Sequence, residues 1–253
     1  QVGDDLPATI RANFGTVLVA SMFGARVEQH EDNPPWIVHR AGHTISLEQV
    51  ADTDPTDFSQ GWIPRAAERM QAYHDLLESV PGLREQVQIV LPDLQGPFDN
   101  LELICGSETF LHLATDPELV SAALTTLATA QVGLARYFAQ WTTERDPGIS
   151  HQHGFSVAGH ILLRGDSFIM LSPQMYRELI APHDETVLQA LGGGGVHSCG
   201  NFMHQVDGLL ELPSLRCLDF GQSYLNDVDA VYARARERGV GLTRVYATRE
   251  ELT

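Results

Sequence analysis

The sharpest chemical feature of the sequence is a histidine and a cysteine one residue apart, in His197-Ser198-Cys199. Side chains alternate between the two faces of a β-strand, so a strand here points His197 and Cys199 to the same face. Gly200 then allows the chain to turn sharply. An imidazole beside a thiolate is a ligand pair that suits zinc. The alternative, a buried histidine packed against a buried thiol, stays open on spacing alone.

Polar side chains also follow several runs that we expect to be strands. In a parallel α/β barrel the active site lies at the carboxyl ends of the strands. Two carboxylates at such ends are candidate catalytic groups, Asp166 and Asp219. Three further polar groups are candidates for substrate binding, Asp93, Gln95 and Gln222. We expect these side chains to line one cavity together with the His-x-Cys pair.

Two of these residues have alternative interpretations. Asp166 ends an apolar run, where it could equally be a helix N-cap or the partner of Arg164. Cys217 lies two residues before Asp219 and would face the same way, one step deeper in the strand. Core packing is the commoner role for such a buried cysteine, so Cys217 is a weak candidate for a third metal ligand.

Six strand-like runs alternate with helical patterns and would position these groups. The expected strands are Val17–Phe23, Val87–Leu91, Val157–Leu163, Gly195–Cys199, Leu215–Phe220 and Leu242–Tyr246. Such alternation is typical of a parallel sheet with right-handed crossovers. We predict an α/β fold, a (β/α)8 TIM-type barrel with about six of its eight strands in this chain. An open sheet with helices on both faces is the alternative.

The helical patterns are clearer than the strands. Apolar residues spaced by three, four or seven between Leu119 and Trp141 predict one long helix, with Asp116 as its N-cap and Pro117 at its first position. Ser172-Pro173 is a second N-cap residue followed by proline at the first helical position. Pro182 should kink or end the helix that follows. Further helices are expected over Ile63–Leu77, Phe202–Leu210 and Val228–Arg238.

Composition limits the protein class and its partners. The formal net charge of -17 argues against nucleic acid and anionic membranes as partners. Three scattered cysteines suit a reducing cytoplasm, and no apolar run approaches the ~18–20 residues that span a bilayer. No linker or repeat divides the chain, so we expect a single domain over 1–253. Because it opens at Gln1 and stops at Thr253 just inside a helical pattern, we expect a fragment cut at both ends.

Three stretches of the chain together resemble the uroporphyrinogen decarboxylase superfamily. They are PDLQGPFDNLELICGSETFLHLATDPELV (92–120), LLRGDSFIMLSPQMYRELIAPH (162–183) and GGGGVHSCGNFMHQVDGLLELPSLRCLDF (192–220). Their order and spacing match the superfamily, whose fold is the barrel predicted above. The resemblance is specific for the superfamily and weak for the individual member.

The resemblance implies one of two chemistries. True decarboxylases act on a porphyrinogen without metal, using an aspartate in the first strand, a tyrosine after the second and an arginine-rich N-terminal segment. Here those stretches read NFGTVLVASMFG (13–24) and NLELICG (100–106), with neither residue. The other branch transfers methyl groups between a corrinoid and a thiol at a zinc ion held by His-x-Cys and a distant cysteine.

His197 and Cys199 match the first two zinc ligands of that branch, and the third would lie beyond Thr253. The resemblance therefore implies zinc-dependent methyl transfer, with a small molecule or a corrinoid protein as substrate. Tetrapyrrole decarboxylation is the alternative activity. A module that binds a corrinoid or tetrapyrrole without catalysis is the alternative from another class.

Overall fold

Four parallel strands form the largest sheet of the computed structural model, which describes residues 7–39, 45–146, 148–152 and 154–246. The strand order is β10-β9-β8-β7. The strands are β7 (Leu162–Arg164), β8 (Gly194–Ser198), β9 (Leu215–Phe220) and β10 (Gly241–Thr243). Of the six expected strands, Leu215–Phe220 is present with the predicted bounds, and those at Gly195 and Leu242 are present with shifted ends.

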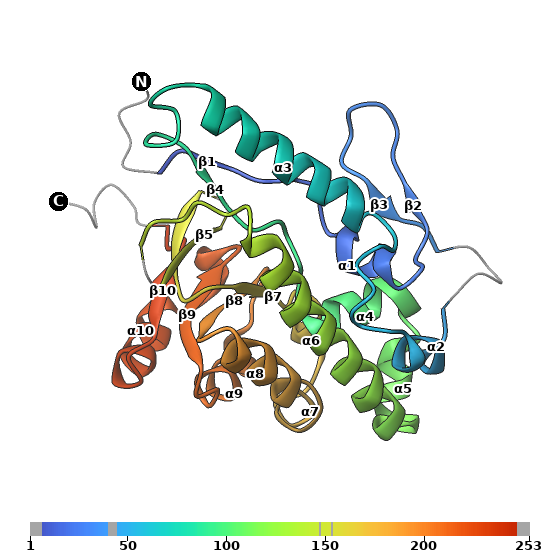
Figure 1. Cartoon of the computed structure of the whole chain (residues 1–253). Coiled ribbons are helices and arrows are strands. Elements are labelled where there is room, and N and C mark those ends of the chain that lie inside the picture. Colours follow the sequence, from blue (N-terminus) through green and yellow to red (C-terminus); the bar gives the residue numbers. More distant parts are fainter. Residues whose placement is uncertain (1–6, 40–44, 147, 153, 247–253) are drawn as a thin grey trace.

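Helices that alternate with these strands cover the outer face of the sheet (Figure 1). They are α8 (Ala181–Ala190), α9 (Val206–Leu210) and α10 (Val228–Glu237). The outward side chains Leu163, Val196 and Leu218 are buried in the same core as the apolar side chains of these helices. Because side chains alternate along a strand, the residues between them must face the other side of the sheet.

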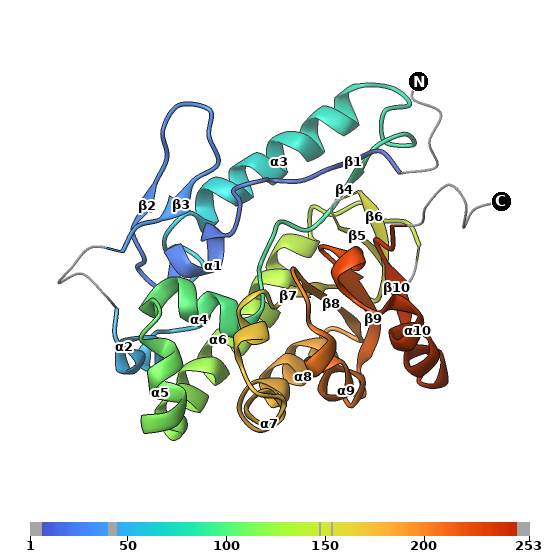
Figure 2. The same ribbon diagram turned by 180° about the vertical axis from the view of Figure 1, so that it is seen from behind.

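The second parallel pair joins β1 (Thr9–Ile10) to β4 (Gln88–Ile89), with Ile10 opposite Ile89. The pair lies beneath the long helix α3 (Ile63–Ser79), as seen from both sides in Figures 1 and 2. Six strands thus lie in parallel pairs, in two sheets. The described residues neither show nor exclude that these sheets are parts of one barrel, so the mixed α/β fold is confirmed and the barrel stays a prediction.

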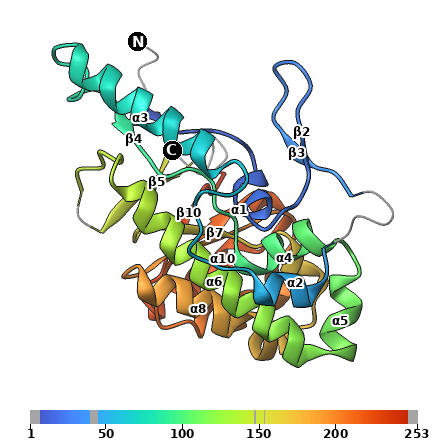
Figure 3. The same ribbon diagram turned by 45° about the vertical axis from the view of Figure 1, so that its right-hand side comes forward.

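Two antiparallel hairpins complete the strands. The hairpin of β2 (Val27–Glu28) and β3 (Trp36–Ile37) extends from the body on the same side as α3 (Figure 3). The hairpin of β5 (Ile149–Gln152) and β6 (Phe155–Ala158) packs through β6 against β8, β9 and β10. The other helices are α1 (Val17–Met22), α2 (Leu47–Asp52), α4 (Pro97–Cys105), α5 (Thr109–Thr115), α6 (Pro117–Ala139) and α7 (Pro173–Met175).

The expected strand Val17–Phe23 is wrong, because these residues form helix α1. All six residues of α1 are buried, so the run is apolar on every side and carries no helical periodicity. A short apolar run cannot be assigned to a strand or a buried helix by pattern alone. The strand beside β4 is instead β1, whose two residues are too few to give an alternating pattern.

The expected strand Val157–Leu163 is two strands, β6 and β7, separated at Gly159. Gly159 has φ +98°, and a Cβ there would lie 2.5 Å from the Gly193 carbonyl oxygen. The chain therefore reverses at the only residue type that fits this contact and this backbone conformation. β6 returns along β5, and β7 enters the parallel sheet beside β8.

Helix signals at the sequence level are confirmed in most places. Asp116 caps α6 by accepting a hydrogen bond from the Leu119 amide at 3.2 Å, and Ser172 accepts from the Met175 amide at 3.2 Å. Pro182 does not end its helix: a π-helical turn over Tyr176–Ile180 precedes it, and the chain continues as α8. The widened turn accommodates the proline, which has no amide hydrogen to donate.

Helix α6 is long and apolar enough, by length and composition, to cross a membrane. Half of its most apolar window is buried inside the protein, against α2, α4 and α8 among other elements. This burial is typical of the core helix of a soluble protein.

Candidate metal centre

The inner face of the four-stranded sheet carries two rows of side chains, one above the other. Strand register aligns Leu162, Gly195, Cys217 and Gly241 in the lower row, and Arg164, His197, Asp219 and Thr243 in the upper row. The lower row is apolar: Leu162, Cys217 and Val157 of β6 form a small buried cluster. The upper row lies at the carboxyl ends of the strands and is polar throughout.

His197 is the centre of the upper row and is 4% exposed. Its Nδ1 lies 2.8 Å from Asp219 Oδ2 and 2.5 Å from Arg244 Nη2. Its Nε2 points the other way, 3.5 Å from Cys199 Sγ and 3.6 Å from Asp166 Oδ1. One ring edge therefore faces a charged pair, and the other faces a thiol and a carboxylate.

Cys199 follows β8 at a tight turn, where Gly200 has φ +73°. The Cys199 amide donates to Asp166 Oδ1 at 2.6 Å, and the Gly200 amide donates to Gln222 Oε1 at 2.5 Å. Burial raises the pKa of the half-buried Cys199 thiol, and the negative charge of Asp166 raises it further. Without a metal this cysteine is therefore protonated at neutral pH.

Asp166 is the exposed member of the group, and Asp99 of α4 holds its loop. The two Asp99 oxygens accept from the amides of Asp166 and Ser167 at 2.8 and 2.9 Å. Asp99 is buried, and that burial raises its pKa to about 7 despite the two amide donors. Asp166 Oδ1 thereby stays beside the His197 ring.

These three residues are the candidate metal centre. The ligand atoms of Asp166, His197 and Cys199 all lie within 4.8 Å of one another, so the group could hold a metal ion. The sequence predicted the His197 and Cys199 pair and gave Asp166 a catalytic role. The weak candidate Cys217 lies in the row below, where burial raises its pKa to about 12.

Asp219 has every oxygen engaged. Arg244 donates from Nε and Nη2 at 2.7 and 2.5 Å, and the Thr243 hydroxyl donates at 2.9 Å. Burial alone would raise the pKa of Asp219, but the hydrogen bonds from His197 and Arg244 outweigh it and hold the pKa at about 2. These contacts suit a carboxylate that orients His197 more than one that transfers a proton.

The predicted substrate-binding residues divide into two places. Gln222 supports the turn at Gly200, as above. Asp93 lies 3.0 Å from Arg164 Nε and accepts from Gln95 Nε2 at 2.7 Å, so both join the upper row through Arg164. Gln95 has φ +57°, and Gln131 of α6 donates to its carbonyl oxygen at 2.9 Å.

Sequence reasoning missed Asp99 and Arg244 and treated Arg164 only as a partner of Asp166. Asp99 lies within a helix, and Arg244 follows β10 in an unremarkable stretch at φ +54°. Their link to His197 comes from tertiary structure alone. No spacing in the sequence carries that signal.

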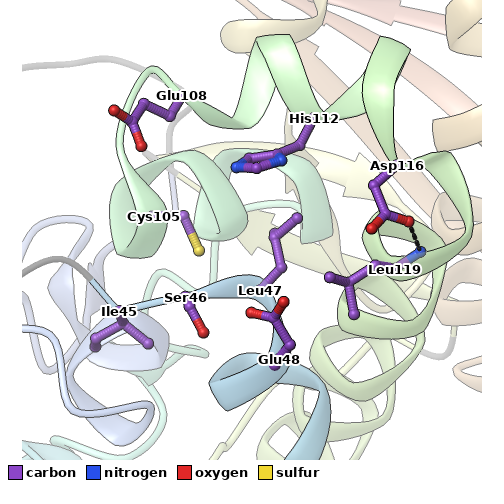
Figure 4. Close-up of a pocket in the computed structure, with 9 residues that line it drawn as sticks. All are labelled: Ile45, Ser46, Leu47, Glu48, Cys105, Glu108, His112, Asp116 and Leu119. Atoms are coloured by element: carbon purple, nitrogen blue, oxygen red, sulfur yellow. Dashed lines mark hydrogen bonds between the residues drawn. The ribbon is translucent and has the colours of Figure 1, made fainter.

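A cavity of about 300 Å³ lies apart from this centre, between α2, α5 and the start of α6 (Figure 4). Carboxylates of Glu48, Glu108 and Asp116 line it together with the His112 ring. Asp116 is already occupied as the α6 cap, as the dashed line in Figure 4 shows. The cavity contains none of the residues of the candidate metal centre.

No protein-family model matches the chain, and no curated protein resembles it significantly in sequence.

Proposed function

We propose that the chain is a zinc-dependent methyltransferase of the kind found in the uroporphyrinogen decarboxylase superfamily, transferring a methyl group between a corrinoid and a thiol. The observation that carries the proposal is the convergence of Asp166 Oδ1, His197 Nε2 and Cys199 Sγ at the carboxyl ends of β7 and β8. The resemblance of three sequence stretches to that superfamily supports it.

The donor set fits zinc. One nitrogen, one sulfur and one carboxylate oxygen are ligands that zinc takes in tetrahedral sites, and three protein ligands leave a fourth position for a substrate. Asp166 and Cys199 are not fully buried, so a substrate could reach the group from solvent. The third ligand expected beyond Thr253 is not required if Asp166 occupies its place.

The surrounding residues prepare His197 for this role. A neutral imidazole that binds metal through Nε2 carries its proton on Nδ1, where Asp219 Oδ2 can accept it. In that tautomer Arg244 Nη2, which can only donate, directs its hydrogen to Asp219 Oδ2 and not to Nδ1. Arg244 keeps Asp219 ionised and in position through its two hydrogen bonds. Asp99 fixes the Asp166 loop, and Gln222 fixes the turn after Cys199.

Bound zinc would supply one chemical effect, which is to keep an incoming thiol as its thiolate at neutral pH, with the proton released to solvent. Methyl transfer would then form a sulfur–carbon bond as the cobalt–carbon bond of the methyl donor breaks, with the electron pair of the broken bond left on cobalt. The protein contributes orientation and a buried apolar row beneath the centre, which excludes water from one side.

Metal analysis and an activity assay on the purified protein test the proposal. We expect about one zinc per chain, and loss of it in Cys199→Ser and His197→Ala. Cys105→Ala, which removes a thiol outside the centre, should keep its zinc. Demethylation of a methyl-corrinoid with a thiol acceptor should disappear with the metal.

Two results would favour the alternatives. Turnover of a porphyrinogen that is unaffected by metal removal would indicate a decarboxylase. A protein that binds a corrinoid tightly but holds no zinc, and is unchanged by His197→Ala, would be a binding module.

A further inference from the structure

Arg164 occupies the position next to His197 in the upper row, yet the metal centre does not use it. The register of β7 and β8 places the two residues directly opposite each other. The Arg164 side chain is only 9% exposed. A buried guanidinium is costly unless its donors are paired, so its partners show what the position is for.

The donors of Arg164 are only partly satisfied. Its Nε lies 3.0 Å from Asp93 Oδ2, which pairs the charges, but the contact is too bent for a hydrogen bond. Its Nη2 is fully buried and has no hydrogen-bond acceptor among the described residues. The same is true of Nη1 of Arg11, which directly follows β1. The buried guanidinium of Arg164 and the half-buried guanidinium of Arg11 therefore each have a buried donor that lacks an acceptor.

The arginine and aspartate side chains around Arg164 carry a net charge of one positive unit when Arg164 itself is counted. Burial lowers the pKa of Arg164, and the charges of Asp93, Arg11, Asp219 and Arg244 also act on it. Three arginines thus face two aspartates, a surplus of one positive charge. Zinc, the Asp166 carboxylate and the Cys199 thiolate together would carry no net charge, so an occupied metal centre would leave this surplus in place.

We propose that Arg164, together with Arg11, binds the carboxylate of a small organic monocarboxylate that reacts at the neighbouring metal centre. A carboxylate supplies one negative charge and two acceptor oxygens for a guanidinium fork. A phosphate dianion would exceed the surplus and face Asp93 and Asp219. Neighbouring strands are about 4.8 Å apart, so the ligand's reactive end lies within a few bonds of its carboxylate.

The second half of this inference rests on the proposed function, so its test begins without metal. Propionate is titrated into metal-free protein by calorimetry, with propionamide, phosphate and butylamine as comparison ligands. We expect saturable binding of propionate, at least about tenfold weaker binding of the other three, and about a tenfold loss in Arg164→Lys, which keeps the charge but not the fork. Arg216→Lys, at an exposed position on β9, is the matched control and should bind as the unaltered protein does.

A double variant guards against misfolding. Arg164→Gln alone would leave Asp93 as a buried charge without its ion-pair partner. Arg164→Gln combined with Asp93→Asn removes both charges together. We expect that pair to fold and to lose propionate binding. Equal binding of propionate and propionamide, or full propionate binding by either Arg164 variant, would refute the proposed carboxylate site. Water would then be the hydrogen-bond partner of Arg164. Propionate binding in a protein that never takes up zinc would keep the anion site and refute only the metal chemistry.

Discussion

Replacing Asp219 by asparagine tests how much stability comes from this buried carboxylate of the upper row, both oxygens of which accept hydrogen bonds. The pKa of this carboxyl falls from an ordinary 3.8 to about 2 in the folded protein. At about 1.4 kcal/mol per pKa unit, ionisation of Asp219 contributes about 2.5 kcal/mol to the free energy of unfolding at pH 7. The residue is 2% exposed, so solvent screening removes little of this amount.

The sign of the pH dependence follows from the lowered pKa. The stabilisation is present in full above the unfolded value of 3.8 and is lost as the pH falls through the folded value of about 2. We therefore expect Asp219→Asn to lower the free energy of unfolding by about 2.5 kcal/mol at pH 7 and by about 1.3 kcal/mol at pH 3. Urea denaturation of the two proteins at both pH values measures the difference.

Asp207→Asn is the matched control. Asp207 also pairs with an arginine, Arg234 at 2.6 Å, but its side chain is 61% exposed. An exposed ion pair contributes about 0.2–1 kcal/mol, so this variant should lose well under half as much stability as Asp219→Asn. Equal losses in the two variants, or a loss at Asp219 that is the same at pH 7 and pH 3, would refute the assigned role of the buried network.

Four further stability predictions concern other parts of the fold. Burial raises the pKa of Asp184 to about 7. The protonated carboxyl therefore contributes to the free energy of unfolding below pH 4, and this contribution is lost as the pH rises through 7. Asp184→Asn should remove that loss, so the denaturation midpoint of the variant should rise relative to that of the unaltered protein between pH 5 and pH 8. Gly159→Ala should cost about 3 kcal/mol or more, because the new methyl meets the Gly193 backbone. Gly239→Ala, at φ +67° with open space around it, should cost about 1–2 kcal/mol in the same assay. Asp116→Ala should lower thermal stability by about 1 kcal/mol through loss of the α6 cap, and no loss would mean that the cap hydrogen bond is replaced by water.

The parts of the fold predicted from sequence are those with a local signal. The α6 helix carries its own periodicity, cap and proline, so its start was predicted at the correct residue. The His-x-Cys spacing sets two side chains on one face in any strand, and β8 is such a strand up to Ser198. In both cases the information lies within a few consecutive residues.

The parts that were missed depend on contacts between distant segments. Helix α1 is enclosed on all sides, which removes the polar face that would have identified it as a helix. The reversal at Gly159 is explained only by the backbone of Gly193, more than thirty positions away in the chain. Arg244 and Asp99 reach the His197 site from β10 and α4, and neither has a neighbour in sequence that marks it.

The separation of Cys199 and Cys217 by one row of the sheet gives the protein two thiol probes of different kinds. Cys199 is half-buried at the strand end, whereas Cys217 is 1% exposed beneath His197 and Asp219. An alkylating reagent such as iodoacetamide should modify Cys199 in the native state, at a rate set by its thiolate fraction. Cys217 can be modified only after the sheet opens, so its labelling rate reports the population of opened molecules. Comparing the two rates in one sample therefore separates occupancy of the centre from unfolding of the strands beneath it.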